Sequence, residues 1–208
     1  MTLSNQNKKM KTAYQNPLTL PTAEAVPAES QLILEGVKKK FGFIPNLMIA
    51  FSPSPAVLQA YLTLADLASK TSFTAKEQHA AALIISQELG CPYCLAAHGT
   101  LGQSVGLDKD TVVALQTRAD LSDERLEALR TLLLSLIESK GHPEPDAIKA
   151  FRTAGYTDPQ IGEAVLLVTW KTLSNYTNHL YDTPIDDAFA PNAAPEQYDA
   201  ELSACSVA

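Results

Sequence analysis

The sequence has few basic residues for its length. Its 208 residues include 16 Lys and Arg against 23 Asp and Glu, which gives a formal net charge of −7. Nucleic acids and anionic membrane surfaces are bound by clustered Lys and Arg. The one run of three consecutive lysines, residues 38–40, is better explained as the solvated end of a short helix. We therefore expect no nucleic acid and no membrane among the partners.

Long apolar segments are also lacking. No run of about 18 apolar residues occurs, so no segment is predicted to span a bilayer. The first 30 residues contain no apolar core of the kind that a secretory signal needs. These absences predict a cytoplasmic protein, in a compartment where thiols are kept reduced.

Strand patterns are missing, whereas helix signals recur. No window alternates apolar and polar residues over strand length. Capping residues instead precede apolar segments at Ser30, at Ser54 before Pro55, and at Thr74 with Glu77 three residues later. The sequence predicts an all-α fold. We expect a loosely ordered arm over 1–28, one helical domain over 29–187 and an irregular tail over 188–208.

Cysteine is scarce, and two of the three cysteines lie in the segment "ELGCPYCLAAHGT". Gly90 is expected to end one helix, and Pro92 is tolerated only in the first turn of the next. Cys91 then becomes the N-cap and Cys94 the third helical residue, both at the positive end of the helix dipole. That environment lowers a thiol pKa and favours the nucleophilic thiolate.

A histidine follows one turn later. Cys94 and His98 are about 40° apart on the helix surface, so His98 could take a proton from either thiol. The N-cap position favours Cys91 as the attacking thiol, whereas proximity to His98 favours Cys94. The order stays open, with a slight preference for Cys94. No glycine-rich dinucleotide motif is present, so we expect no bound cofactor and an external dithiol as electron donor.

Two other interpretations of the motif are possible. Two cysteines and one histidine could be ordinary helix filling. They could also form half of a zinc site completed by His79, although no second CxxC or HxxxH supplies the usual further ligands. The redox interpretation is preferred, and no metal is expected.

With these residues in view, the sequence resembles the alkylhydroperoxidase D family, or carboxymuconolactone decarboxylase-like superfamily. The resemblance rests on "CPYCLAAH", on the helix "FTAKEQHAAALIISQELG" before it, and on flanking segments similar to the peroxidase-related branch. It covers about residues 30–187. It implies an all-helical fold that assembles as a homo-trimer or hexamer. It also implies a thiol-dependent peroxidase or peroxiredoxin-reducing activity, with an organic hydroperoxide or a protein disulfide as substrate.

The resemblance also implies roles for particular residues. Cys91 and Cys94 would be the redox pair, and His98 part of a proton relay. The relay usually includes a Glu twelve residues before the first cysteine, and this position is His79 here. His79 could serve as the base itself, and Glu88 is a second candidate.

Three further residues are candidates for the substrate pocket. Tyr93, between the cysteines, and Asn175 and His179, late in the last long helix, could line the entrance. The alternatives for Asn175 and His179 are helix capping and subunit contacts.

Competing functions remain at this point. A non-enzymatic helical oligomer could sense oxidants or bind zinc through the same thiols. A cysteine-independent decarboxylase on the same scaffold is a further alternative, although such members generally lack the cysteine pair.

Overall fold

The computed structural model describes residues 18–195, and within this range every regular element is helical. The α-helices are α2 (Ala28–Phe41), α3 (Asn46–Phe51), α4 (Pro55–Ser69), α5 (Ala75–Glu88), α6 (Pro92–Ser104), α7 (Lys109–Thr117), α8 (Glu124–Glu138), α9 (Pro145–Thr153) and α10 (Asp158–Tyr181). Short 3₁₀ helices are η1 (Ala23–Ala25) and η2 (Ala190–Asn192). The predicted all-α fold is confirmed. Cys205 lies outside the described residues.

Local capping chemistry sets the starts of the helices that lead to the cysteines. The Ser54 hydroxyl accepts a hydrogen bond from Val57 N, and α4 begins at Pro55. At α5 the Thr74 hydroxyl accepts from Glu77 N, while Glu77 Oε2 accepts from Thr74 N at 2.8 Å. Both predicted helix starts are confirmed, and the second is a reciprocal capping box.

The predicted cap at Ser30 is wrong. Helix α2 begins two residues earlier, at Ala28, directly after Pro27. Ser30 is therefore part of the helix and points inward, and its buried hydroxyl finds no hydrogen-bond partner in the described part of the chain. The extended backbone of Pro27 (ψ 144°) followed by helix-forming residues outweighs the capping preference of serine.

Helix α5 lies at the centre of the molecule. Residues 80–85 are all at most 2% exposed, and consecutive residues of a helix point to all sides. A helix buried all round must be surrounded, and α4, α6, α7, α8 and α10 all contact α5. The helix that precedes the cysteines is thus the core of the fold.

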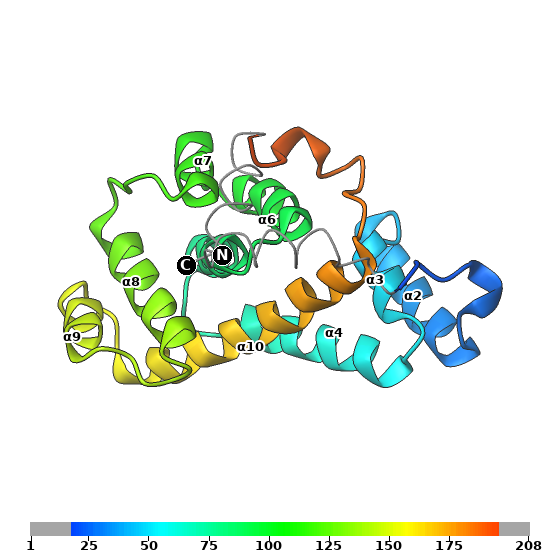
Figure 1. Cartoon of the computed structure of the whole chain (residues 1–208), viewed down its shortest axis with the longest axis horizontal. Coiled ribbons are helices and arrows are strands. Elements are labelled where there is room, and N and C mark those ends of the chain that lie inside the picture. The colour runs from blue at the N-terminus through cyan, green and yellow to red at the C-terminus, as the bar shows by residue number, and fades with distance from the viewer. Residues whose placement is uncertain (1–17, 196–208) are drawn as a thin grey trace, which may run out of the picture.

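Helix α10 runs along the long axis of the molecule, from α8 and α9 at one end to α3 at the other (Figure 1). Its buried face changes character along its length. After Gln160, which belongs to the N-terminal capping box, this face carries two apolar residues and then three polar ones; in order they are Ala164, Leu167, Lys171, Ser174 and Asn178. Because they recur every three or four residues, they share one side of the helix. The polar half is the part that approaches the cysteines.

The segment after α10 folds back over α6. Asn192 Nδ2 donates to Thr100 Oγ1 at 3.1 Å, and Gln116 Nε2 donates to Asn192 O at 2.9 Å. A Cβ on Gly99 would lie 3.0 Å from Gln116 Nε2 and 3.2 Å from Asn192 O, so a larger residue would push these groups away from α6. Residues 188–195 of the predicted tail are therefore attached to the helical domain.

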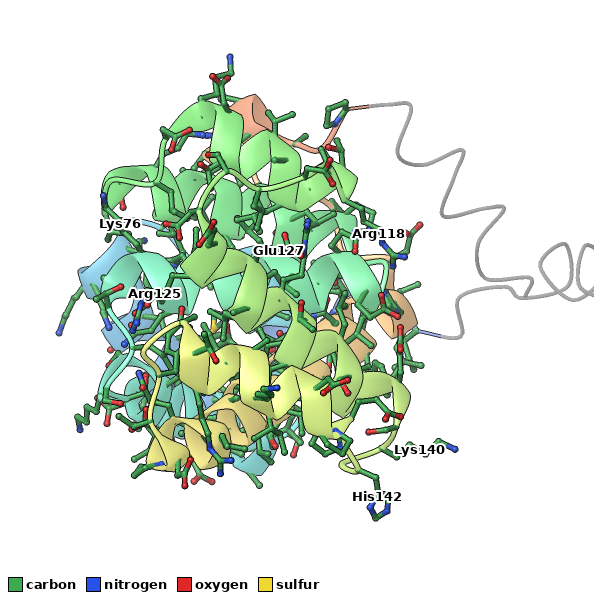
Figure 2. All side chains as sticks on the ribbon, turned by 90° about the vertical axis from the view of Figure 1, so that its left-hand side faces the viewer. Lys76, Arg118, Arg125, Glu127, Lys140 and His142 are labelled. Carbon is green, nitrogen blue, oxygen red and sulfur yellow. The ribbon has the colours of Figure 1, made fainter. Side chains whose placement is uncertain are left out.

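The turn between α8 and α9 is exposed at residues 140–142. At the turn between α8 and α9, Lys140 and His142 point away from the helices (Figure 2). Lys140 adopts a positive φ of 56°, and Gly141 follows with 91°. None of the described helices combines the length and apolar composition that a membrane span requires.

Candidate functional site

The two cysteines are fixed by a helix end and a helix start. Gly90 has a φ of 68°, and Cys91 N donates to Ser86 O at 2.9 Å, which ends α5 in a Schellman-type turn. Pro92 then occupies the first position of α6. Cys91 is the N-cap of α6, and Cys94 is its third residue, as the sequence predicts.

Both sulfur atoms are buried free thiols, at 0% and 1% exposure of Cys91 and Cys94. Asn178 of α10 joins them, because its Nδ2 lies 3.5 Å from Cys91 Sγ and 3.3 Å from Cys94 Sγ. Ser174 Oγ lies 3.8 Å from Cys94 Sγ. The second half of α10 thus provides the polar surroundings of the pair.

The two thiols differ in their pKa. Burial raises the pKa of Cys91, and the neighbouring Cys94 raises it further. Burial also opposes ionisation of Cys94, but a hydrogen bond from Cys91, the charge of Lys171 and contacts with Ser174 together lower its pKa below the ordinary value. Cys94 is therefore the thiolate of the pair and Cys91 the thiol.

Two histidines meet beside the cysteines. His98 Nδ1 lies 3.1 Å from His79 Nδ1, which joins α6 to α5. Burial and then the charge of Lys171 lower the pKa of His79 to about 4. The same two causes, followed by His79, lower the pKa of His98 well below its usual range. Both imidazoles are therefore neutral near pH 7.

A buried lysine completes the cluster. Lys171 is 0% exposed, and its Nζ lies 3.4 Å from Cys94 Sγ and 2.9 Å from His98 Nε2. Lys171 is not part of the sequence motif that predicts the site. The signal was present, because Lys171 lies four residues after Leu167 and three before Ser174, on the face of α10 that turns inward.

A cavity of about 540 Å³ opens onto this cluster. Its inner wall includes Cys94, His98, His79 and Lys171, whereas Cys91 does not line it. Most of the remaining wall is apolar, and aromatic rings contribute to it: Tyr61, Tyr93, Trp170 and Phe189. A small molecule in the cavity would reach Cys94 and not Cys91.

Tyr93 is a wall residue of this cavity, and its role in a substrate pocket stays a prediction. Its hydroxyl donates to Asp186 Oδ2 at 2.6 Å, and its ring packs edge-on against Phe189 at 6.2 Å between centroids. Asp186 also accepts from Asn46 N, at the start of α3. Tyr93 therefore connects α6 to the segment that follows α10.

Comparison with known proteins agrees with this architecture. Residues 55–134 match the model of the carboxymuconolactone decarboxylase family. The match includes α4, α5 and α6, and therefore both cysteines and both histidines of the site. No curated protein matches the sequence.

Several solved structures share the fold. A peroxidase-related protein with an alkylhydroperoxidase D core, from Ralstonia eutropha JMP134, is 22% identical with a TM-score of 0.70 over 85% of this chain and 96% of that chain. A peroxidase-related protein from Silicibacter sp. TM1040 is 20% identical with a TM-score of 0.73, over 84% and 93%. The debrominase Bmp8 is 17% identical with a TM-score of 0.68, over 86% and 96%. At these identities the likeness establishes the fold.

The other predicted site residues lie outside the contact network of the thiols. Glu88 pairs with Arg118 at 2.6 Å, and Arg118 lies at the surface of the molecule (Figure 2). Asn175 is buried and donates to Lys171 O at 2.6 Å, so it supports the backbone beside the site. His179 Nε2 lies 3.2 Å from Gly90 O, at the turn before Cys91. None of the three lines the cavity.

The zinc alternative has no support in the geometry. Among residues 18–195, no group of three or more His, Cys, Asp or Glu side chains is arranged to hold a metal ion. Lys171 Nζ lies 3.4 Å from Cys94 Sγ and 2.9 Å from His98 Nε2, where a positive charge would repel a metal cation.

Proposed function

We propose that this protein is a thiol-dependent oxidoreductase that reduces organic hydroperoxides through a Cys94 and Cys91 cycle. The observation that supports the proposal is the asymmetry of the pair. Cys94, whose pKa is lowered, lines the cavity, whereas Cys91, whose pKa is raised, lies behind it. Attack requires an accessible thiolate, and resolution requires a second thiol within reach.

The cycle has three steps. The Cys94 thiolate attacks the peroxide oxygen that bears hydrogen, the O–O bond breaks, and an alcohol leaves once its oxygen is protonated. Cys94 is then a sulfenic acid, which condenses with the Cys91 thiol to a disulfide and releases water. An external dithiol reduces the disulfide and is itself oxidised to a disulfide. The peroxide gains the two electrons that the dithiol loses.

The burial of both sulfurs favours small reactants. A folded protein disulfide would have to reach atoms that are at most 1% exposed, whereas a small hydroperoxide or dithiol could enter the cavity. The peroxiredoxin-reducing alternative is therefore the weaker one. The apolar wall suits an alkyl or aryl hydroperoxide better than hydrogen peroxide.

The test begins with reduced protein carrying Cys205→Ser, so that Cys91 and Cys94 are the remaining cysteines. One equivalent of cumene hydroperoxide should remove both thiols and about two mass units, as disulfide formation requires. Cys94→Ser should not react. Cys91→Ser should consume one equivalent and stop at a sulfenic acid that dimedone traps. Full turnover of Cys94→Ser with a dithiol donor would refute the proposal.

A second candidate is reductive dehalogenation of a small aromatic ring. The aromatic wall of the cavity favours it, and a cysteine-to-alanine variant of the debrominase Bmp8 has been solved with 2,3,4-tribromopyrrole. In this reaction the thiolate would take the halogen, the ring carbon would take a proton, and Cys91 would displace halide to form the disulfide. Release of bromide from tribromopyrrole, with no reaction towards cumene hydroperoxide, would replace the first proposal with this one.

A further inference from the structure

Lys171 is a buried cation with an unusual partner. It is 0% exposed, and the described part of the chain contains no ion pair between it and a carboxylate. The one acidic group that contacts its Nζ is the Cys94 thiol, at 3.4 Å. A buried charge is strongly disfavoured unless a counter-charge compensates it. A neutral amine beside a neutral thiol would bury no charge, whereas an ammonium beside a thiolate would pair two charges. The charge of Lys171 lowers the pKa of Cys94, which favours the ion pair.

We infer that Lys171 is a catalytic residue that holds Cys94 as a thiolate and donates the proton that the leaving oxygen needs. This inference rests on the proposed function and assigns the acid of the same reaction. The resemblance assigns proton transfer to a Glu and His relay, but a histidine occupies the Glu position here. The lysine provides the positive charge and the exchangeable proton that two neutral imidazoles lack.

The contacts define a direction for the proton path. An ammonium group only donates hydrogen bonds, so His98 Nε2 must accept from Lys171. The proton of neutral His98 then resides on Nδ1, which donates to His79 Nδ1. His79 consequently carries its proton on Nε2. The chain runs from the reacting sulfur through Lys171 and His98 to His79, which also lines the cavity.

The proton balance of the oxidation step follows. The thiolate forms an S–O bond as the O–O bond breaks, and the departing alkoxide takes a proton from the Lys171 ammonium. The lysine is left as an amine. It regains a proton when the Cys91 thiol ionises, and the Cys91 thiolate then attacks the sulfenic acid of Cys94. The hydroxide that this attack releases leaves as water, after a proton from solvent has passed along His79 and His98.

Few other titratable groups lie near enough to Cys94 to stabilise its thiolate or to donate the proton. The titratable groups that line the cavity or contact the cluster are Lys40, Tyr61, Asp66, His79 and Tyr93, together with Cys91, Cys94 and His98. The Tyr93 hydroxyl donates to Asp186. Burial and then the charge of Cys94 raise the pKa of Tyr61, so the phenol stays protonated. The Lys171 ammonium is thus the cation in direct contact with Cys94.

The experiment separates the two roles of Lys171 with two reagents. Iodoacetamide alkylates a thiolate and releases iodide, which needs no proton, whereas a hydroperoxide releases an alkoxide, which does. Both rates are measured against pH in the Cys205→Ser background, and peptide mass mapping assigns the alkylation to Cys94. Lys171→Met keeps an unbranched side chain, one atom shorter, and removes its charge. Lys171→Arg keeps a charge but holds its proton too tightly to act as an acid.

In Lys171→Met the pH midpoint of Cys94 alkylation should rise by roughly one to three units, the usual effect of losing one opposite charge. Above that midpoint alkylation should recover, but cumene hydroperoxide should still react about 10²-fold more slowly than with wild type, the usual loss for one general acid. Lys171→Arg should retain the wild-type alkylation profile and lose the hydroperoxide rate. Lys109→Met, an exposed lysine on α7, is the matched control and should change neither rate.

The outcomes separate this inference from the proposed function. An unchanged alkylation profile in folded Lys171→Met would overturn the ion pair, and a wild-type hydroperoxide rate at high pH would overturn the acid role. If Lys171→Met does not fold, a wild-type hydroperoxide rate in Lys171→Arg would overturn the acid role on its own. If the Cys94 thiolate depends on Lys171 but the wild-type protein does not react with hydroperoxides, the proposed function is overturned. The ion pair between Lys171 and Cys94 is then still supported.

Discussion

Helix α5 contributes to two polar clusters, one around Glu77 and one around His79. The two clusters differ in how their charges are balanced. Glu77 lies in the first turn and His79 follows, about 200° further round the helix. Glu77 accepts from Thr74 N at 2.8 Å and from Arg125 Nε at 2.8 Å. The Arg125 guanidinium also stacks over the Tyr156 ring at 3.8 Å, on the face of the molecule formed by α8 (Figure 2).

The cluster around Glu77 is internally balanced. Its carboxylate and guanidinium neutralise each other, and burial, which would raise the pKa of Glu77, is outweighed by the hydrogen bonds from Thr74 and Arg125. The cluster around His79 contains a cation, two neutral imidazoles and no carboxylate. Its balance depends on the ionisation of Cys94.

The difference shows what separates a structural polar cluster from a reactive one. Where two permanent charges neutralise each other, no group is left to react. Where the counter-charge of a buried cation is a thiolate, any reaction that consumes the thiolate also removes the partner of the cation. At the thiol site, a reaction at sulfur is therefore coupled to proton transfer. The Glu77 cluster contributes only to the stability of the fold.

The largest expected effect comes from breaking the balanced cluster. Glu77→Ala removes the capping box and the partner of Arg125, and it should lower the free energy of unfolding by about 3 kcal/mol, from the lost cap and the broken, partly buried ion pair. Urea denaturation measures the change. Alkylation of Cys94 in the folded fraction should stay at the wild-type rate.

Arg152→Ala is the matched control for this prediction. It breaks the Arg152 and Asp158 pair, whose side chains are 55% and 67% exposed, so little or no change in the free energy of unfolding is expected. An equal loss of stability in both variants would show that the position on α5 has no special importance. A loss of Cys94 reactivity in folded Glu77→Ala would show that the two clusters are not independent.

Much of the fold follows from local sequence signals. The caps at Ser54 and Thr74 and the turn at Gly90 place α4, α5 and the start of α6, because they satisfy backbone groups within a few residues. The same kind of argument failed at Ser30, where the preceding proline started the helix earlier. Helix α3 was not predicted, because three prolines in its segment obscured a six-residue helix whose start depends on the distant Asp186.

Only those site residues that are close in the sequence could be predicted. Cys91, Cys94 and His98 lie on one helix, so spacing alone brings them together. Lys171 and Asn178 approach from a helix more than 70 residues away, and only the packing of α10 against α6 decides that contact. A lysine within an apolar helix is usually exposed, so its inward position could be suspected only from the periodicity of its neighbours.

An intermediate effect is expected when a carboxylate is introduced into the cluster around His79, which would then resemble the cluster around Glu77. His79→Glu places a carboxylate next to His98 Nδ1 and restores the residue type that the resemblance assigns to this position. The new negative charge should raise the pKa of His98 by roughly one to two units, because it stabilises the imidazolium. Titration of the histidine resonances by NMR measures the shift. An unmoved His98 resonance would show that the two side chains no longer meet in the variant.

The smallest expected effect concerns stability at acid pH. Burial and the charge of Lys171 hold the pKa of folded His79 at about 4, against about 6.5 for an ordinary histidine. Above pH 6.5 the histidine is neutral in both states and has no influence. Between pH 6.5 and 4 the imidazole of residue 79 binds a proton in the unfolded chain but not in the folded chain. The free energy of unfolding therefore falls as the pH falls.

His79→Gln removes this proton uptake without adding a charge. At pH 5 wild type should have lost about 1 to 2 kcal/mol more of its pH 7 stability than the variant, after allowance for the partial exposure of His79. Urea denaturation of both proteins at pH 7 and pH 5 measures the difference, and acid-sensitive carboxylates such as Glu77 cancel because both proteins contain them. Parallel loss of stability in the two proteins would mean that His79 titrates normally in the fold. The imidazole would then not be the neutral end of the proton path that starts at Lys171.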